Sequence, residues 1–330
     1  MPPTSSTLNT GSGQPATEGR RTGSSAAAAP LIHVGYPKAA SSFLQQAVFG
    51  AHPGLCEPWP TGDNTVLERI CWVREADFDP ERVARDFSGA HLAAGADKRP
   101  VISHEVLVGN PNQRLFWGDT AAGRLARAFP GARVLILIRE QASLGLSTWT
   151  EFVRRGGQHG LRQVVGVKGA RPPGYRPFLP AEYLRYSPLV ALYQDLFGAE
   201  RVTVLPVEML RRDPGRFFAQ LWSAAEVEPH PVDATDRVYQ GLGPTTLKLT
   251  RWGNRVSGSG PGEPRNALDT RLIRPLLKLS ARAEGKLRPS AKVRMPDDVK
   301  AHIRRIVADD NRRLEELTGL DLESLGYALS

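Results

Sequence analysis

Cysteine and long apolar runs are both scarce in this chain, and each scarcity excludes a class of protein. The 330 residues include only 2 cysteines, Cys56 and Cys71. Two thiols outside a C-x-x-C pattern do not make the disulfide framework of a small secreted protein. They favour a reducing compartment, and the sequence does not decide whether they pair with each other.

No segment reaches the roughly 18 continuous apolar residues that a membrane span requires. Residues 1–30 are rich in Ser, Thr, Gly, Pro and Ala and lack the apolar core of a secretory signal. Such a segment buries too little apolar surface to order itself. We therefore expect a disordered tail over 1–30, one domain over 31–330, no membrane span and a cytoplasmic protein. Abundant Arg, Ala, Gly and Pro with little Lys is typical of a GC-rich bacterial gene.

The segment Leu31–Leu44, LIHVGYPKAASSFL, is the most informative part of the chain. An apolar run ends at Gly35, and Lys38 and two serines precede the start of a helical pattern. A strand, a tight turn and a helix in this order bring backbone N–H groups and the positive end of a helix dipole to one place. The segment therefore predicts a loop that binds a phosphate-like anion.

The spacing of this loop differs from that of nucleotide hydrolases, which read G-x-x-x-x-G-K-[ST]. No glycine directly precedes Lys38, and Pro37 removes one backbone donor. The lysine also stands early in the turn. The pattern therefore disfavours a site that hydrolyses a nucleoside triphosphate.

A second motif follows a second expected strand. Arg133–Ile138 is a nearly continuous apolar run, as a buried parallel strand requires. Arg139 stands at its end, and a helix is expected over 141–153 with Ser147 eight residues after the arginine. Ligands of open α/β sheets bind at the carboxyl ends of the strands, and a guanidinium suits phosphate oxygens. Arg139 and Ser147 are therefore candidates for a second phosphate contact.

Between these motifs, a short apolar run over 100–103 ends in His104 and Glu105. Either side chain is able to accept a proton from an attacking hydroxyl. Adjacent residues of a strand face opposite sides, so we expect only one of them to serve as the base. The pattern favours His104 slightly and leaves Glu105 open.

These motifs together resemble the PAPS-dependent sulfotransferases, whose phosphosulfate loop is close to G-x-P-K-[SA]-G-[ST]-[ST]-x-L. Ala40 stands where that family usually has glycine, so we expect strain there if the residue needs a positive φ. The family's histidine, or the glutamate of an S-x-E stretch, matches His104 or Glu105. The resemblance implies catalytic roles for Lys38, His104 and Glu105. It implies nucleotide contacts from Pro37, Lys38, Ala39, Ala40, Ser41, Ser42, Arg139 and Ser147.

The resemblance also implies a fold and a reaction. We expect an α/β, three-layer P-loop-like fold with a central parallel sheet flanked by helices. We expect sulfuryl transfer from PAPS, released as PAP, to a hydroxyl or amine of a glycan, lipid or small metabolite. No metal cluster is visible in the sequence and the reaction requires none. The acceptor and the oligomeric state are not readable.

The formal charge of +9 is concentrated late in the chain. Between Thr245 and Arg294, twelve Lys and Arg stand against three acids, a surplus equal to that of the whole chain. This stretch predicts either a basic flap over the nucleotide or a solvated helix over 269–286 packed through its leucines. Two other functions are compatible with parts of the pattern: an ATP-dependent small-molecule kinase, and a basic anion- or nucleic-acid-binding protein. No nucleic-acid module accompanies the charge, so we expect no nucleic-acid partner.

Overall fold

The computed structural model describes residues 29–167, 169, 174–232, 242–258, 260–261, 266–287 and 292–330. The tail predicted over 1–30 therefore lies almost wholly outside the described residues. The strands are β1 Leu31–Gly35, β2 Leu55–Cys56, β3 Arg99–His104, β4 Arg133–Ile138 and β5 Val202–Pro206.

The helices are distributed along the whole described chain. They are α1 Ser41–Phe43, α2 Pro80–Gly95, α3 Gly118–Ala128, α4 Gln141–Arg154, α5 Leu161–Val165, α6 Ala181–Leu184, α7 Ser187–Phe197, α8 Met209–Arg212, α9 Pro214–Ala225, α10 Pro244–Ser257, α11 Arg274–Leu287 and α12 Asp297–Thr318. Short 3-10 or π-helical turns are η1 Leu44–Phe49, η2 Leu67–Cys71, η3 Glu75–Asp77, η4 Pro111–Gln113, η5 Ala199–Arg201 and η6 Asp269–Ile273.

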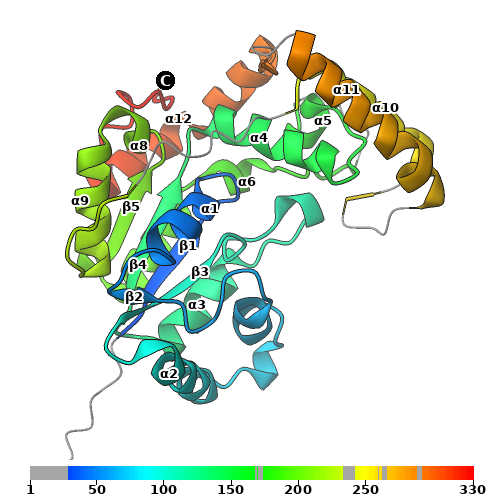
Figure 1. The fold of residues 1–330 in the computed structure, drawn as a ribbon. Coiled ribbons are helices and arrows are strands. Elements are labelled where there is room, and N and C mark those ends of the chain that lie inside the picture. Colours follow the sequence, from blue (N-terminus) through cyan, green and yellow to red (C-terminus); the bar gives the residue numbers. More distant parts are fainter. Residues whose placement is uncertain are drawn as a thin grey trace, which may run out of the picture.

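The five strands form one sheet in the order β2-β3-β1-β4-β5, and every pairing is parallel. Helices flank this sheet (Figure 1), so the predicted α/β fold with a central parallel sheet is confirmed. All five residues of β1 are buried. This burial explains why β1 and β4 read as continuous apolar runs rather than as alternating strands.

The sequence predicted several element boundaries correctly. The expected strand over 133–138 has those bounds, and the helix expected from 141 ends at Arg154 instead of residue 153. Asp213 caps α9 by accepting a hydrogen bond from the Arg216 amide at 3.0 Å. Gly319 ends α12 in the left-handed conformation, at φ 67°.

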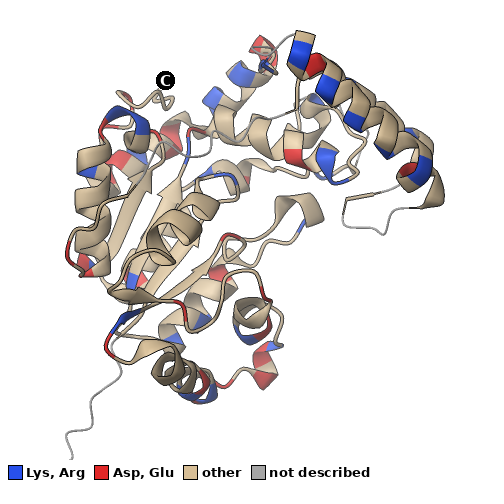
Figure 2. Cartoon of the chain, in the orientation of Figure 1, with Lys and Arg blue, Asp and Glu red and all other residues tan. Residues whose placement is uncertain are grey.

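The basic stretch forms a helical pair at one end of the molecule (Figure 1), and Figure 2 shows Lys and Arg along both of its helices. None of the α11 residues is buried. In the alternative of a helix over 269–286 packed through its leucines, three of them do not pack inward, because Leu272, Leu276 and Leu279 are about three-fifths exposed, at 59%, 65% and 64%. Leu277 is half-buried.

Cys56 and Cys71 are both free, so they do not pair. Among the helices of the described residues, none is both long enough and apolar enough to cross a bilayer.

Candidate functional site

The sheet topology brings the predicted site residues to one edge. β1 lies between β3 and β4, and its residue Val34 pairs with His104 while Gly35 pairs with Leu137. The carboxyl ends of the three strands therefore meet. As predicted from the sequence, the residues that follow these strands lie side by side at the edge where α/β proteins bind ligands.

The loop Gly35–Ser42, called the lysine loop below, is held in an unusual backbone conformation. Lys38 has φ 72° and Ala40 has φ 62°, both in the left-handed region that disfavours residues with a Cβ. Ala40 lies directly before α1, and its carbonyl accepts the amides of Phe43 and Leu44 at 3.0 and 3.1 Å. The alanine that stands in place of the usual glycine therefore does adopt the strained conformation. Strain of this kind is concentrated at functional sites.

Two buried polar atoms in and beside the lysine loop have no hydrogen-bond partner among the described residues. The Ser41 Oγ is buried and has no hydrogen-bond partner among the described residues. A Cβ on Gly35 would lie 2.3 Å from this oxygen and 3.1 Å from His33 Nε2, which is also buried without a partner there. Position 35 requires glycine, because a Cβ there would overlap the Ser41 oxygen. Two polar atoms without partners mark a place where a polar ligand atom would satisfy them.

His33 was not recognised from the sequence, because it lies inside an apolar strand. Its Nδ1 is 2.8 Å from Ser103 Oγ, which also accepts a hydrogen bond from Gln45 Nε2 at 3.0 Å. Burial lowers the pKa of His33 to about 3, so the ring is neutral. This network joins β1, β3 and η1 under the lysine loop.

Arg139 joins the two predicted phosphate motifs directly. Its Nη1 donates to the Lys38 carbonyl at 2.9 Å, and its own carbonyl accepts the Tyr186 hydroxyl at 2.6 Å. Tyr186 in turn packs edge-on against Tyr36 of the lysine loop, with ring centroids 4.6 Å apart. The arginine is therefore held between the loop and the core while its guanidinium stays half-buried.

Lys38 has an acidic partner that the sequence did not reveal. Its Nζ lies 3.3 Å from an oxygen of Glu151 on α4, whose carboxylate also pairs with Arg154 and Arg155 at 2.8 Å each. Burial raises the pKa of Glu151, but Arg155, Lys38 and Arg154 outweigh it and hold the pKa below its usual value. The lysine is thus held by a carboxylate that an anionic ligand would have to displace.

The remaining predicted nucleotide contacts lie close by. Ser147 precedes Glu151 by four residues and therefore shares its face of α4. Ser147 and Pro37 are half-buried, Ala39 is buried, and Ser42 is exposed at the start of α1. The structure therefore collects both motifs around the loop.

The two candidate bases differ in their surroundings. The Val106 amide donates to His104 Nδ1 at 3.2 Å. A neutral ring that accepts at Nδ1 carries its proton on Nε2. Burial lowers the pKa of His104, while Asp63 acts in the opposite direction. The ring is therefore neutral at neutral pH and is a donor at Nε2. Glu105, half-buried, follows the end of β3. Burial, then Tyr36 and the charge of Glu105, raise the pKa of Tyr183.

These features define an α/β protein with a strained, lysine-containing loop at the carboxyl edge of a parallel sheet. A solved structure with the same fold is the sulfotransferase from Alicyclobacillus acidocaldarius. It is 17% identical with a TM-score of 0.55, and the match covers 90% of this chain and 99% of that chain. This likeness confirms the predicted sulfotransferase-like fold.

Two sulfotransferase domains match less closely in shape. The sulfotransferase domain of the Synechococcus PCC 7002 olefin synthase is 14% identical with a TM-score of 0.38, and the match covers 84% of this chain and 93% of that chain. The sulfotransferase domain of the curacin biosynthetic pathway is 15% identical with a TM-score of 0.37, and the match covers 84% of this chain and 96% of that chain. The sequence itself matches no protein-family model and no curated protein.

Proposed function

We propose that this protein transfers a sulfuryl group from PAPS to a hydroxyl or amine of an acceptor such as a glycan, a lipid or a small metabolite. The observation that carries the proposal is the junction of the two phosphate motifs. Lys38 and Ser41 belong to one strained loop, the buried Ser41 Oγ has no partner among the described residues, and the Arg139 guanidinium donates to the Lys38 carbonyl of the same loop. This contact between Arg139 and the Lys38 carbonyl supports one site that holds two phosphate groups.

The residues present fit such a donor. The Ser41 hydroxyl of the lysine loop has no partner among the described residues, which suits an anionic oxygen as its partner. Lys38 would bind the phosphosulfate, together with Ser41, Ser42 and the amides of Ala39 and Ala40 beside Pro37. Arg139 and Ser147 would bind the second phosphate, because a guanidinium forms paired hydrogen bonds with phosphate oxygens.

PAPS supplies the sulfuryl group and leaves as PAP. The acceptor oxygen forms a bond to sulfur as the bond from sulfur to the phosphate oxygen breaks. Lys38 and the loop amides stabilise the negative charge that develops on the leaving phosphate. Such donors are already in place before the reaction and need little reorganisation, as in phosphoryl transfer.

For the proton of the acceptor, we assign Glu105 as the base ahead of His104. What supports this order is the hydrogen bond from the Val106 amide to His104 Nδ1, which leaves Nε2 protonated. His104 would then donate a hydrogen bond from Nε2 to the acceptor or to the transferring group.

The test is calorimetric titration of PAP into the full chain and into Lys38→Ala and Arg139→Ala. We expect 1:1 binding that weakens by roughly tenfold or more in each variant, because each loses a charged hydrogen-bond donor. Lys278→Ala, an exposed lysine on α11, is the matched control and should bind PAP as the unaltered chain does.

Absence of PAP binding, or steady ATP turnover with Mg²⁺, would overturn the proposal in favour of another nucleotide or of a kinase. Labelled PAPS with a cell extract, followed by mass spectrometry of the labelled product, then identifies the acceptor.

A further inference from the structure

A cavity of about 620 Å³ that is open to solvent lies away from the lysine loop. It is lined by residues of α4, α5, α10 and the segment that leads into α12. Its lining residues are Trp149, Gly160, Leu161, Arg162, Gln163, Pro244, Leu247, Lys248, Arg251, Arg255, Val293, Arg294 and Pro296. We call it the basic cavity. Its volume is within the range of cavities that hold small organic ligands.

The basic cavity and the lysine loop use different faces of α4. Ser147 and Glu151 lie on the face toward Lys38. Trp149 is two residues from each of them, a rotation of about 200° around the helix axis. The indole Nε1 of Trp149 donates to the His159 carbonyl at 3.1 Å, which turns it toward α5. A ligand in the basic cavity would therefore be separated from the lysine loop by α4.

The positive charge of the basic cavity is largely uncompensated. Arg162 is neutralised by both carboxylate oxygens of Asp298, at 2.6 and 2.7 Å. Within the described part of the chain, no carboxylate pairs with the other four lining cations, which are Lys248, Arg251, Arg255 and Arg294.

Two acids of the adjacent helical pair, Glu284 and Asp269, are already engaged. Glu284 of α11 accepts the backbone amides of Thr245 and Thr246, and Asp269 pairs with Arg274 at 3.2 Å. Burial, and then the charge of Arg255, lower the pKa of Arg251. A bound anion would favour the charged form of Arg251 and offset both effects.

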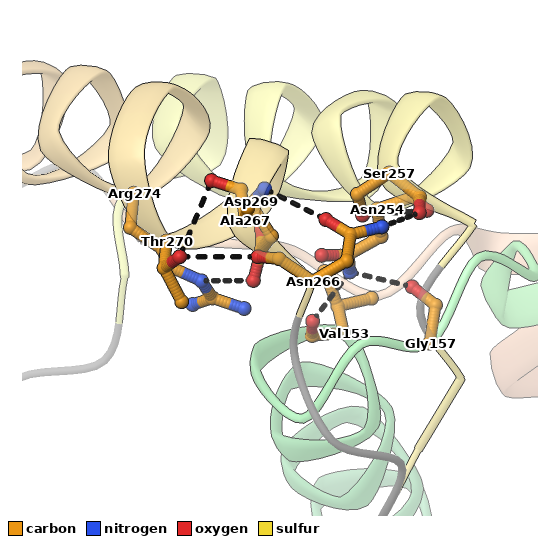
Figure 3. Close-up of polar contacts among 9 residues, drawn as sticks. All are labelled: Val153, Gly157, Asn254, Ser257, Asn266, Ala267, Asp269, Thr270 and Arg274. Carbon is orange, nitrogen blue, oxygen red and sulfur yellow. Dashed lines mark hydrogen bonds and ion pairs between the residues drawn. The ribbon is translucent and has the colours of Figure 1, made fainter.

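The wall that carries these cations is rigidly attached. Asn254 of α10 is fully buried, and its amide donates to the carbonyls of Val153 and Gly157 at 2.8 and 3.0 Å (Figure 3). Asn266 bonds the Ser257 carbonyl at 2.5 Å and so joins the end of α10 to η6 (Figure 3). The cations are therefore held over the cavity by a preformed frame.

The other surfaces of the basic cavity are apolar. Trp149, Leu161, Leu247 and Val293 line it together with two prolines. A free inorganic anion would leave this surface wet, whereas an anion with an organic group would cover it. We propose that the basic cavity binds a phosphate or sulfate monoester that carries an aromatic or aliphatic group.

Two probes test this proposal, because the monoester could be a free metabolite or a lipid headgroup. Phenyl phosphate is titrated into the full chain by calorimetry, and vesicles of phosphatidylcholine with and without phosphatidic acid are tested by co-sedimentation. We expect at least one probe to bind, and binding to weaken by roughly tenfold in Arg251→Gln. Arg82→Gln, an exposed arginine on α2, is the matched control and should bind as the unaltered chain does.

The probe that binds identifies the source of the ligand. Failure of both probes overturns the proposal, as does equal binding by Arg251→Gln and the unaltered chain. If Arg251→Gln loses its circular-dichroism signature of folding, the exposed pair Lys248→Gln and Arg255→Gln takes its place.

The Lys38→Ala variant separates this proposal from the proposed function. It should lose PAP and keep the monoester probe. If Lys38→Ala no longer binds the monoester probe while Arg251→Gln still binds it, the probe binds at the lysine loop. That result would overturn the proposal of a second site.

Discussion

The lysine loop and the basic cavity both gather positive charge, yet the fold holds them in different ways. The lysine loop follows a strand buried at all five positions, and its lysine is already paired with Glu151. The basic cavity is walled by α10 next to α11, a helix with no buried residue. Of its five lining cations, only Arg162 pairs with an acid of the described residues, Asp298.

Under the proposed function, the site of chemistry is the region with fewer cations, so charge density alone would not identify it. Twelve cations between Thr245 and Arg294 are the strongest charge signal in the sequence. The lysine loop has only Lys38 and the neighbouring Arg139, but the sheet fixes both at one edge. Catalysis depends on preorganised charge, whereas binding and steering of an anion need only a local excess of charge.

The largest effect is expected at the candidate base. Glu105→Gln should lower kcat about 10²- to 10⁴-fold, because it removes the proton acceptor. His104→Gln should cost less, because it removes only a hydrogen-bond donor. Single-turnover transfer from labelled PAPS to the identified acceptor measures both. The reverse order of the two variants would assign the base to His104.

Ala40→Gly tests whether the lysine loop stores strain. Relief of the left-handed conformation is worth about 1–2 kcal/mol, offset by about 0.4–1 kcal/mol from the freer unfolded chain. We therefore expect a gain of about 0–1.6 kcal/mol in the free energy of unfolding, measured by urea denaturation. A loss of stability would show that the strain at Ala40 is compensated by contacts of its methyl group.

Glu151→Gln should strengthen PAP binding about 1.4- to 5-fold, because a partly exposed ion pair of about 0.2–1 kcal/mol no longer competes for Lys38. Calorimetric titration measures the change. Arg154→Gln is the control, since it breaks another pair of Glu151 without touching Lys38. Weaker binding in Glu151→Gln would mean that the carboxylate positions the lysine instead of competing for it.

The smallest effect is expected at the helical pair. Burial alone would raise the pKa of Glu284, but hydrogen bonds from Thr246 and Thr245 outweigh it and lower the pKa to about 2 from its usual 4.5. Because the pKa of Glu284 is lower in the folded chain than in the unfolded chain, its ionised carboxylate stabilises the fold above about pH 4.5. This contribution is lost as the pH falls from about 4.5 to about 2. Hydrogen exchange of the first α10 amides should therefore accelerate in this range.

Glu284→Gln should accelerate the same exchange at neutral pH. Unchanged exchange in the variant would show that other contacts hold the start of α10.

The sequence alone determined the sheet and the approach to the site. Apolar runs at 31–35 and 133–138 predicted buried parallel strands, and such strands must end at one edge. Lys38, Arg139 and the Ser103–Glu105 stretch were therefore predictable as neighbours. Local signals such as Asp213 before a proline, or Gly319 after a helix, depend on a few adjacent residues and were equally readable.

Only the tertiary structure decided the contacts between residues far apart in the chain. Nothing local marks Glu151 as the partner of Lys38, His33 as a neighbour of Ser41, or Glu284 as the cap of α10. The exposed leucines of α11 show the same limit, because amphipathic spacing indicates a helix face but not what covers it. These features depend on how the helices pack on the sheet, and packing brings together residues that no spacing rule connects.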